Sequence, residues 1–259
     1  MRKVDIHNHL GRNGDNPGFD KTIDIAYSRL GEGGVFGIAN SDDFRYEKFV
    51  EQKGGKYNRV PVSDKKAVYV PERDMLVVKC QEMFTKQGDI LAIAMPHGKE
   101  VKTKNTRDVI MEAIDLGAIL DAVHPFYFES IGNFLEKNVG LLQLFSTWEV
   151  WNGSAVWLPG LSRMNPNKKA TDFYLSNFLE SLASGIGMSA STDGHSAESI
   201  GKCYTMLDDF SLTSKNLPKE LHREFRNVKS LDKLHRESNK WDVCKHAVHM
   251  GLVKTGLMK

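Results

Sequence analysis

Short apolar runs alternate with amphipathic segments along most of the chain. Runs of this kind, bounded by turn-forming residues, predict strands. They lie at residues 4–6, 35–39, 67–70, 75–83, 89–95, 118–123, 144–151 and 186–190. Apolar residues at three- and four-residue spacing predict helices at 19–30, 46–50, 106–116, 171–182 and within 217–250. Because strands and helices alternate, the pattern favours an α/β fold with a mainly parallel sheet.

Two segments have the composition of loops. Residues 11–18 are rich in Gly, Asn and Asp, and residues 53–66 contain Gly and Lys without an apolar period. We expect residues 53–66 to form a mobile flap. Lys86-Gln87-Gly88 separates two strand-like runs and predicts a tight turn between them.

Composition adds little beyond the class of protein. A chain of 259 residues, 41% apolar and 26% charged, is long enough for one barrel-like α/β domain or for two small ones. Its three cysteines, Cys80, Cys203 and Cys244, are odd in number and widely spaced, which favours reduced thiols. With no apolar run of the ~20 residues that cross a bilayer and no signal-like start, we expect a cytoplasmic protein without membrane contact.

Charge is unevenly distributed. Residues 211–259 carry 11 Lys and Arg against 5 Asp and Glu, whereas the rest of the chain is slightly acidic. A basic tail could hold a nucleic acid or an acidic partner. The alternative, the solvated face of terminal helices, is the interpretation that we favour.

Candidate chemistry begins with His7-Asn8-His9, directly after the first strand. Residues two apart on a strand point the same way, so both imidazoles can face one metal ion. Further imidazoles and carboxylates sit at or just after the ends of later strand-like runs: Glu82, His97, His124, Asp193 and His195. Functional residues of α/β folds gather at the carboxyl ends of strands, so the pattern predicts one shared metal site.

Four stretches resemble, in order, the motifs of the PHP family (polymerase and histidinol phosphatase domains). They are Asp5-Ile6-His7-Asn8-His9, Gly34 to Asp43, Ala122-Val123-His124-Pro125-Phe126, and Ser191-Thr192-Asp193-Gly194-His195-Ser196. Between them, Cys80-Gln81-Glu82 before Gly88-Asp89-Ile90-Leu91-Ala92 is similar to the family segment that carries a bridging glutamate. The resemblance spans roughly residues 4–205. It implies a metal-dependent phosphoesterase on a distorted seven-stranded β/α (TIM-like) barrel. We expect this barrel within residues 1–210, with residues 211–259 as a helical extension packed on the same domain.

The resemblance also implies a set of ligands for two or three divalent ions. One ion would be held by His7, His9, Glu82 and Asp193, the second by Glu82, His97 and His124, and the third by Asp15, Asp43 and His195. Glu82, Asp193 and His195 are expected to act in catalysis. Asp43 replaces a histidine that is usual in the family, which leaves Asp42 open as the ligand and shifts the preference from zinc toward manganese or iron. For Asp15, a turn-forming role and the rival ligands Asn13 and Asp20 stay open.

Three residues are candidates for substrate binding. Arg12 and Arg45 lie beside ligand positions, where a guanidinium can pair with a phosphate; the alternative is an ordinary surface charge. Asn152, with Glu149, lies in a segment that resembles one preceding the last family motif. The alternatives for this pair are a role behind the ligands and simple packing at a strand end.

The expected activity is hydrolysis of a phosphate ester, in which a metal-bound hydroxide attacks phosphorus. The substrate would be a phosphorylated small molecule, a nucleotide or an oligonucleotide end. Two alternatives remain: an amidohydrolase-type barrel that cleaves C–N bonds, and a non-catalytic module that binds a replication partner. The sequence contains no nucleophile elbow, P-loop or dinucleotide fingerprint.

Overall fold

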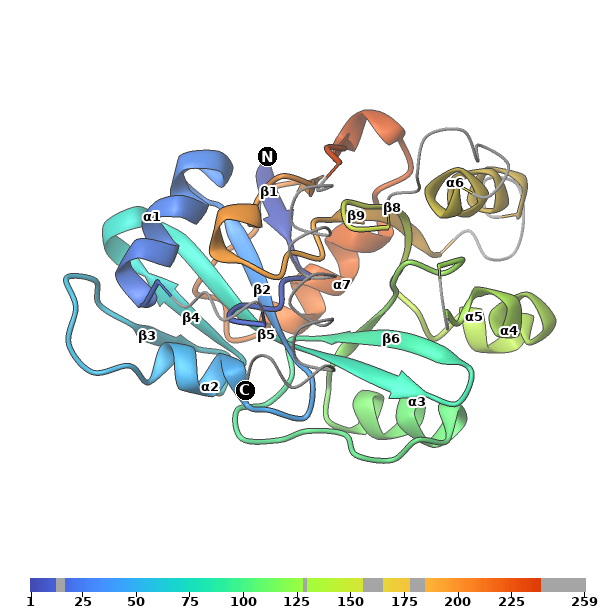
Figure 1. Cartoon of the computed structure of the whole chain (residues 1–259), viewed down its shortest axis with the longest axis horizontal. Coiled ribbons are helices and arrows are strands. Elements are labelled where there is room, and N and C mark those ends of the chain that lie inside the picture. The colour runs from blue at the N-terminus through green and yellow to red at the C-terminus, as the bar shows by residue number, and fades with distance from the viewer. Residues whose placement is uncertain (13–16, 128–129, 156–164, 178–184, 239–259) are drawn as a thin grey trace, which may run out of the picture.

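The computed structural model describes residues 1–12, 17–127, 130–155, 165–177 and 185–238. Within these ranges, one sheet of eleven strands forms the centre of the molecule (Figure 1). Its strands are β1 (Arg2–Asp5), β2 (Val35–Asn40), β3 (Val60–Val62), β4 (Ala67–Val70), β5 (Met75–Thr85), β6 (Gly88–Ile93), β7 (Ile119–Ala122), β8 (Thr147–Asn152), β9 (Gly187–Ser191), β10 (Tyr204–Leu207) and β11 (Leu234–His235).

Seven of these strands follow one another around a barrel-like path, in the order β1-β2-β5-β6-β7-β8-β9. Neighbours along the path are parallel except at β6, which is antiparallel to both β5 and β7. The β3–β4 hairpin extends β5 on the outside, and β10 and β11 extend β1. The predicted distorted α/β barrel is confirmed, although its sheet has eleven strands rather than seven.

The last strand returns to the first and nearly closes the barrel. Asn8 and Gly194 form a parallel bridge, and the backbone N–H of His9 donates to Gly194 O at 2.6 Å. Beneath this bridge the buried Asp5 carboxylate accepts hydrogen bonds from Thr192 N (3.0 Å), Thr192 Oγ1 (2.8 Å) and Gly201 N (2.7 Å). The chain just after β1 is thereby fixed beside the chain just after β9.

Helices cover the outer face of the sheet. They are α1 (Phe19–Leu30), α2 (Arg45–Val50), α3 (Thr106–Asp115), α4 (Gly132–Lys137), α5 (Val139–Leu142), α6 (Pro166–Asn177) and α7 (Leu217–Arg226). Apolar residues of α1 and α2 pack on β2, β4 and β5 in one cluster. A second, larger cluster fills the barrel and includes residues of α3 and α7. No helix in the described ranges has the length and apolar character that spanning a membrane requires.

The structure departs from the predicted elements where local pattern was weak. Residues 53–66 include the short strand β3, which pairs with β4, and strand β10 and helices α4 and α5 had not been predicted. Helix α6 begins at Pro166 rather than at residue 171, and residues 178–182 of the predicted helix lie outside the described residues.

The C-terminal region was predicted to be helical from 217 to 250. Helix α7 instead ends at Arg226, and the short strand β11 follows and pairs with β10. Leu217, Leu221 and Phe225 of α7 belong to the barrel cluster. The division of the chain at residue 210 stays a prediction, and residues 239–259 lie outside the described ranges.

We predict that Asp5→Ala lowers the free energy of unfolding of the metal-free protein by about 2–4 kcal/mol, because it leaves two buried backbone N–H groups, those of Thr192 and Gly201, without an acceptor. Urea denaturation measures this difference. Asp115→Ala, which removes an exposed carboxylate at the end of α3, is the matched control and should change stability by less than about 0.5 kcal/mol. Equal effects of the two substitutions would show that the Asp5 clamp does not stabilise the closure.

Candidate metal centre

Imidazoles and carboxylates from four strands converge at one mouth of the barrel. His7 and His9 follow β1, Glu82 lies near the end of β5, His124 follows β7, and Asp193 follows β9. All except Asp193 are less than 9% exposed, and the Asp193 side chain is 15% exposed. Each lies at or just beyond the carboxyl end of a parallel strand, where the barrel topology gathers functional groups.

Four of these side chains surround one point. His7 Nε2 lies 3.0 Å from His9 Nε2, and His9 Nε2 lies 3.2 Å from Glu82 Oε2. Asp193 Oδ1 lies 3.7 Å from His7 Nε2 and 3.6 Å from His9 Nε2. Ligand atoms at about 2.1 Å from a tetrahedral ion are about 3.4 Å apart. The spacing and the mix of imidazole and carboxylate therefore fit a divalent metal ion.

A second group shares Glu82 with the first. Glu82 Oε1 lies 3.2 Å from His124 Nε2, while its other oxygen faces His9. Ligand atoms of Glu82, His124 and Asp89 all lie within 4.8 Å of one another, as do those of His7, His124 and Asp193. Oε1 also lies 3.6 Å from His7 Nε2, so the Glu82 carboxylate contacts ligand atoms of both groups, as a carboxylate that bridges two ions does.

Asp89 is the member of this arrangement that the sequence analysis missed. In the β5–β6 hairpin, Glu82 pairs with Leu91 and Phe84 pairs with Asp89. Directly opposed residues point to the same face of a sheet, so Glu82 and Asp89 are diagonal neighbours on one face. The predicted turn at residues 86–88 could have indicated that Asp89 lies beside Glu82, because a hairpin turn fixes the register of its strands.

His97 does not join the group, although it was predicted as a ligand of the second ion. Because β6 runs against its neighbours, its beginning lies at the site and its end lies toward the opposite side of the barrel. His97 follows that end, and its Nε2 lies 3.0 Å from Glu51 Oε1, just after α2. Among the described residues, Asp89 rather than His97 accompanies Glu82 and His124.

The three residues assigned to a third ion have different surroundings. The His195 ring lies beside that of His9, with centroids 5.3 Å apart. Asp43 accepts a hydrogen bond from Arg45 Nε at 2.7 Å and another from Ser41 N at 3.1 Å. Asp15 lies outside the described residues. His195 therefore adjoins the first group, whereas the Asp43 carboxylate is held by Arg45.

The neighbours of Asp43 also bear on substrate binding. Asp42, the alternative ligand, is exposed and lies 3.5 Å from Lys104 Nζ. Arg45 was predicted to bind phosphate. Its guanidinium donates hydrogen bonds to the Asp43 carboxylate and, from Nη1, to Leu10 O at 3.3 Å. Arg12 lies in the loop after His9, and its backbone N–H donates to His9 O.

Glu149 and Asn152 of β8 lie behind the site and connect two of its loops. The buried Glu149 carboxylate accepts hydrogen bonds from His124 N (2.5 Å), Asn152 Nδ2 (3.0 Å) and Ser191 Oγ. Asn152 Nδ2 also lies 3.3 Å from Asp193 Oδ2, and its Oδ1 accepts from Ser154 N at 2.9 Å. Both the Nδ2 and the Oδ1 atoms of Asn152 thus form hydrogen bonds within the protein. Because these bonds fix the amide, Asn152 can hold the Asp193 carboxylate in position.

The backbone is strained at two of the converging residues. His124 has φ 31° and Asp193 has φ 50°, a region that non-glycine residues seldom adopt and that costs about 1–3 kcal/mol. The hydrogen bond from His124 N to Glu149 opposes this strain at one of them. Ser41 Oγ lies 3.4 Å from His9 Nδ1; when that nitrogen donates, the lone pair of Nε2 faces the site.

The site gathers ionisable side chains in a buried place, and this shifts the pKa values of its imidazoles and carboxylates. Burial would lower the pKa values of His7 and His124. The Asp193 and Glu82 carboxylates instead raise the pKa of His7 to about 10, and the contact with Glu82 and the charge of Asp193 raise the pKa of His124 to about 9. Burial and the neighbouring His7 lower the pKa of His9. Burial would raise the pKa values of Glu82 and Asp193, but the imidazoles lower both. Burial and the Glu82 charge raise the pKa of Asp89 to about 7.

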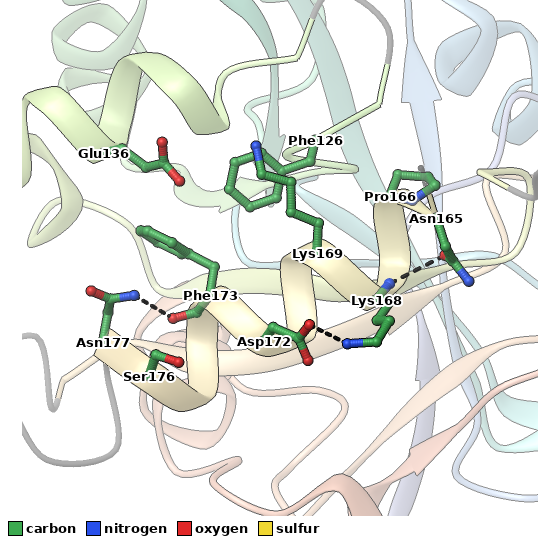
Figure 2. Close-up of a pocket in the computed structure, with 10 residues that line it drawn as sticks. All are labelled: Phe126, Glu136, Asn165, Pro166, Lys168, Lys169, Asp172, Phe173, Ser176 and Asn177. Carbon is green, nitrogen blue, oxygen red and sulfur yellow. Dashed lines mark hydrogen bonds and ion pairs between the residues drawn. The ribbon is translucent and has the colours of Figure 1, made fainter. Parts of the chain in front are cut away.

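Two hollows lie beside helix α4. One, of about 840 Å³, lies between α4 and α6, where Lys169 Nζ stands 3.8 Å from the centre of the Phe126 ring (Figure 2). The other, of about 660 Å³, lies between α4 and the tip of the β5–β6 hairpin and is lined in part by Asp89.

Comparison with solved structures supports the fold. The chain is similar to a two-domain protein from Bacteroides vulgatus described as containing a predicted PHP-like metal-dependent phosphoesterase, with a TM-score of 0.54 and 14% identity over 86% of this chain. It spans 63% of the length of that protein. It is also similar to PsfC from Pseudomonas syringae, with a TM-score of 0.57 and 12% identity over 99% of both chains. No family model and no curated protein matches the sequence. The predicted PHP-like fold is thus confirmed.

We predict that Asp89→Asn reduces the bound manganese or zinc of the purified protein, because one carboxylate of the second group is lost. His97→Ala should leave metal content within about 20% of wild type, as the ring lies outside the groups that surround Glu82. Inductively coupled plasma mass spectrometry of both variants gives the answer. Normal content in Asp89→Asn with a loss in His97→Ala would restore His97 as the ligand.

Metal binding should also release protons. With pKa values of about 10 and 9, His7 and His124 are protonated at pH 7 in the metal-free protein and must lose a proton to bind an ion. We expect release of about two protons per chain at pH 7 and an apparent metal affinity that rises as pH increases toward 9. Calorimetry in buffers of different ionisation enthalpy counts the protons. An affinity independent of pH, without proton release, would contradict this charge state.

Proposed function

We propose that the protein is a metal-dependent phosphoesterase that hydrolyses a phosphate ester of a small molecule or nucleotide. The observation that carries the proposal is the position of Glu82, whose two oxygens face His9 and His124 in adjacent groups of ligand atoms. A bridged pair of divalent ions, when bound, lowers the pKa of water and stabilises charge on the attacking and leaving oxygens at phosphorus. The similarity in fold to a protein described as containing a predicted PHP-like phosphoesterase agrees with this reaction class.

The side chains of the barrel mouth have separate tasks in this proposal. His7, His9 and Asp193 would hold one ion and His124 and Asp89 the other, with Glu82 shared by both. His195, beside His9, completes the wall on that side and can contact the phosphate. Glu149 and Asn152 keep His124 and Asp193 in their strained conformations. The mouth thus provides the fixed, poorly solvated setting in which charge stabilisation is strongest.

Two other reactions or roles are tested by the same assays. A C–N hydrolase would need an amide substrate; the fold similarity to a protein described as containing a predicted PHP-like phosphoesterase favours the phosphoesterase over it. A non-catalytic binding module would have no use for six carboxylate or imidazole groups gathered at one mouth of the barrel, which is costly without a ligand. Single-stranded nucleic acid remains a candidate substrate beside phosphorylated small molecules.

We predict that chelation abolishes hydrolysis of p-nitrophenyl phosphate, that Mn²⁺ restores it, and that p-nitroacetanilide is not cleaved. Glu82→Gln should lower kcat by about 10³-fold or more because the bridging charge is lost. Its matched control is Glu112→Gln, an exposed carboxylate of α3, which should retain wild-type kcat. Cleavage of the amide without cleavage of phosphate esters would replace the proposal by a C–N hydrolase.

A further inference from the structure

The hollow between the β5–β6 hairpin and α4 adjoins the candidate metal centre. Asp89 lines this cavity of about 660 Å³, and its carboxylate also lies within 4.8 Å of ligand atoms of Glu82 and His124. The cavity therefore begins where the second ligand group ends. A volume of this size suits a substrate group rather than a single water or ion.

The far wall of the cavity is basic. Lys86 comes from the hairpin tip and Lys137 from the last turn of α4, and both are exposed. Neither ammonium group forms an ion pair or hydrogen bond with another described residue of the chain, whereas Lys168 and Lys169 of the neighbouring hollow contact Asp172 and Asn133. Asp89 is the acidic residue of the lining, at the end toward the metal centre.

The space between the two ends has a mixed surface. Phe84 and Phe134 contribute partly buried aromatic faces, and Ser130 forms a bridge with Asp89 at the inner end. An aromatic wall packs against the carbon skeleton or ring of a ligand, while the lysines attract an anion at its far side. The lining of the cavity thus combines one candidate metal ligand, two aromatic side chains and two lysines.

We infer that this cavity binds the part of the substrate that leaves with the ester oxygen, and that this part carries a second anionic group. The inference rests on the proposed phosphoesterase function and narrows its substrate class to bisphosphates, or to phosphate esters that also bear a carboxylate. The scissile phosphate lies at the metal centre, the carbon skeleton lies along Phe84 and Phe134, and the distal anion pairs with Lys86 and Lys137.

The test compares substrates that differ in one anionic group. Fructose 1-phosphate and fructose 1,6-bisphosphate differ in a distal phosphate, and glucose 6-phosphate and gluconate 6-phosphate differ in a distal carboxylate. We expect the metal-loaded enzyme to prefer the partner with the second anionic group in at least one pair. In the double variant K86A/K137A, KM for that partner should rise by about tenfold or more, with little change for the partner that has one anionic group.

Lys215→Ala is the matched control, since it removes an exposed lysine outside the cavity. It should leave all four KM values within about twofold of wild type. A selective loss on the bisphosphate identifies phosphate as the distal group, and a selective loss on gluconate 6-phosphate identifies carboxylate. Equal changes on both members of a pair, or none, would overturn the inference.

Different results would show that the inference about the cavity is wrong and that the proposed phosphoesterase function is wrong. If the wild type hydrolyses p-nitrophenyl phosphate but shows no preference for a distal anion, the proposed phosphoesterase activity is supported and the inference about the cavity is wrong. If the wild type hydrolyses no phosphate ester, calorimetric titration of the metal-loaded protein with fructose 1,6-bisphosphate replaces KM. Binding weakened tenfold by K86A/K137A but not by Lys215→Ala then supports the cavity, and unchanged binding overturns it.

Discussion

Closure of the barrel between β1 and β9 is the constraint on which the site depends. The buried Asp5 carboxylate binds the backbone and side chain of Thr192 and thereby fixes the chain after β9 beside the chain after β1. Because His7 and His9 follow Asp5 at once, and Asp193 follows Thr192, one set of hydrogen bonds sets their mutual distance. Without this contact β9 would be the edge strand of an open sheet, and Asp193 would not be held beside His7 and His9.

The charges that this closure brings together explain the chemistry. Glu82 and Asp193 are almost fully enclosed with three imidazoles, and each imidazole lies within 4 Å of a carboxylate. In the metal-free protein, protons on His7 and His124 compensate the carboxylates, which is why their pKa values are raised. Divalent cations can replace these protons with a stronger and better-directed charge. The same balance of charge therefore sets both the stability of the metal-free protein and its affinity for metal.

The reversed strand β6 gives this barrel its particular shape. Its direction places the tip of the β5–β6 hairpin at the mouth, which brings Asp89 to the metal groups and Lys86 to the adjoining cavity. A parallel strand would have carried its C-terminal loop, and with it His97, to the same place. One change of strand direction thus decides both which carboxylate lies beside Glu82 and His124 and the charge of the neighbouring wall.

The sequence by itself determined the elements with strong local pattern and the candidate ligands at the ends of parallel strands. Helix α1 has the predicted bounds, and His7, His9, Glu82, His124 and Asp193 converge because the carboxyl ends of parallel strands meet at one rim. Only the tertiary structure placed Asp89 beside Glu82 and His97 away from it, since the direction of β6 depends on pairing between strands and leaves no trace in apolar periodicity. The tertiary structure also decided that Arg45 donates to Asp43 and that Asn152 donates to Asp193. Hydrogen bonds between side chains depend on packing rather than on local sequence pattern.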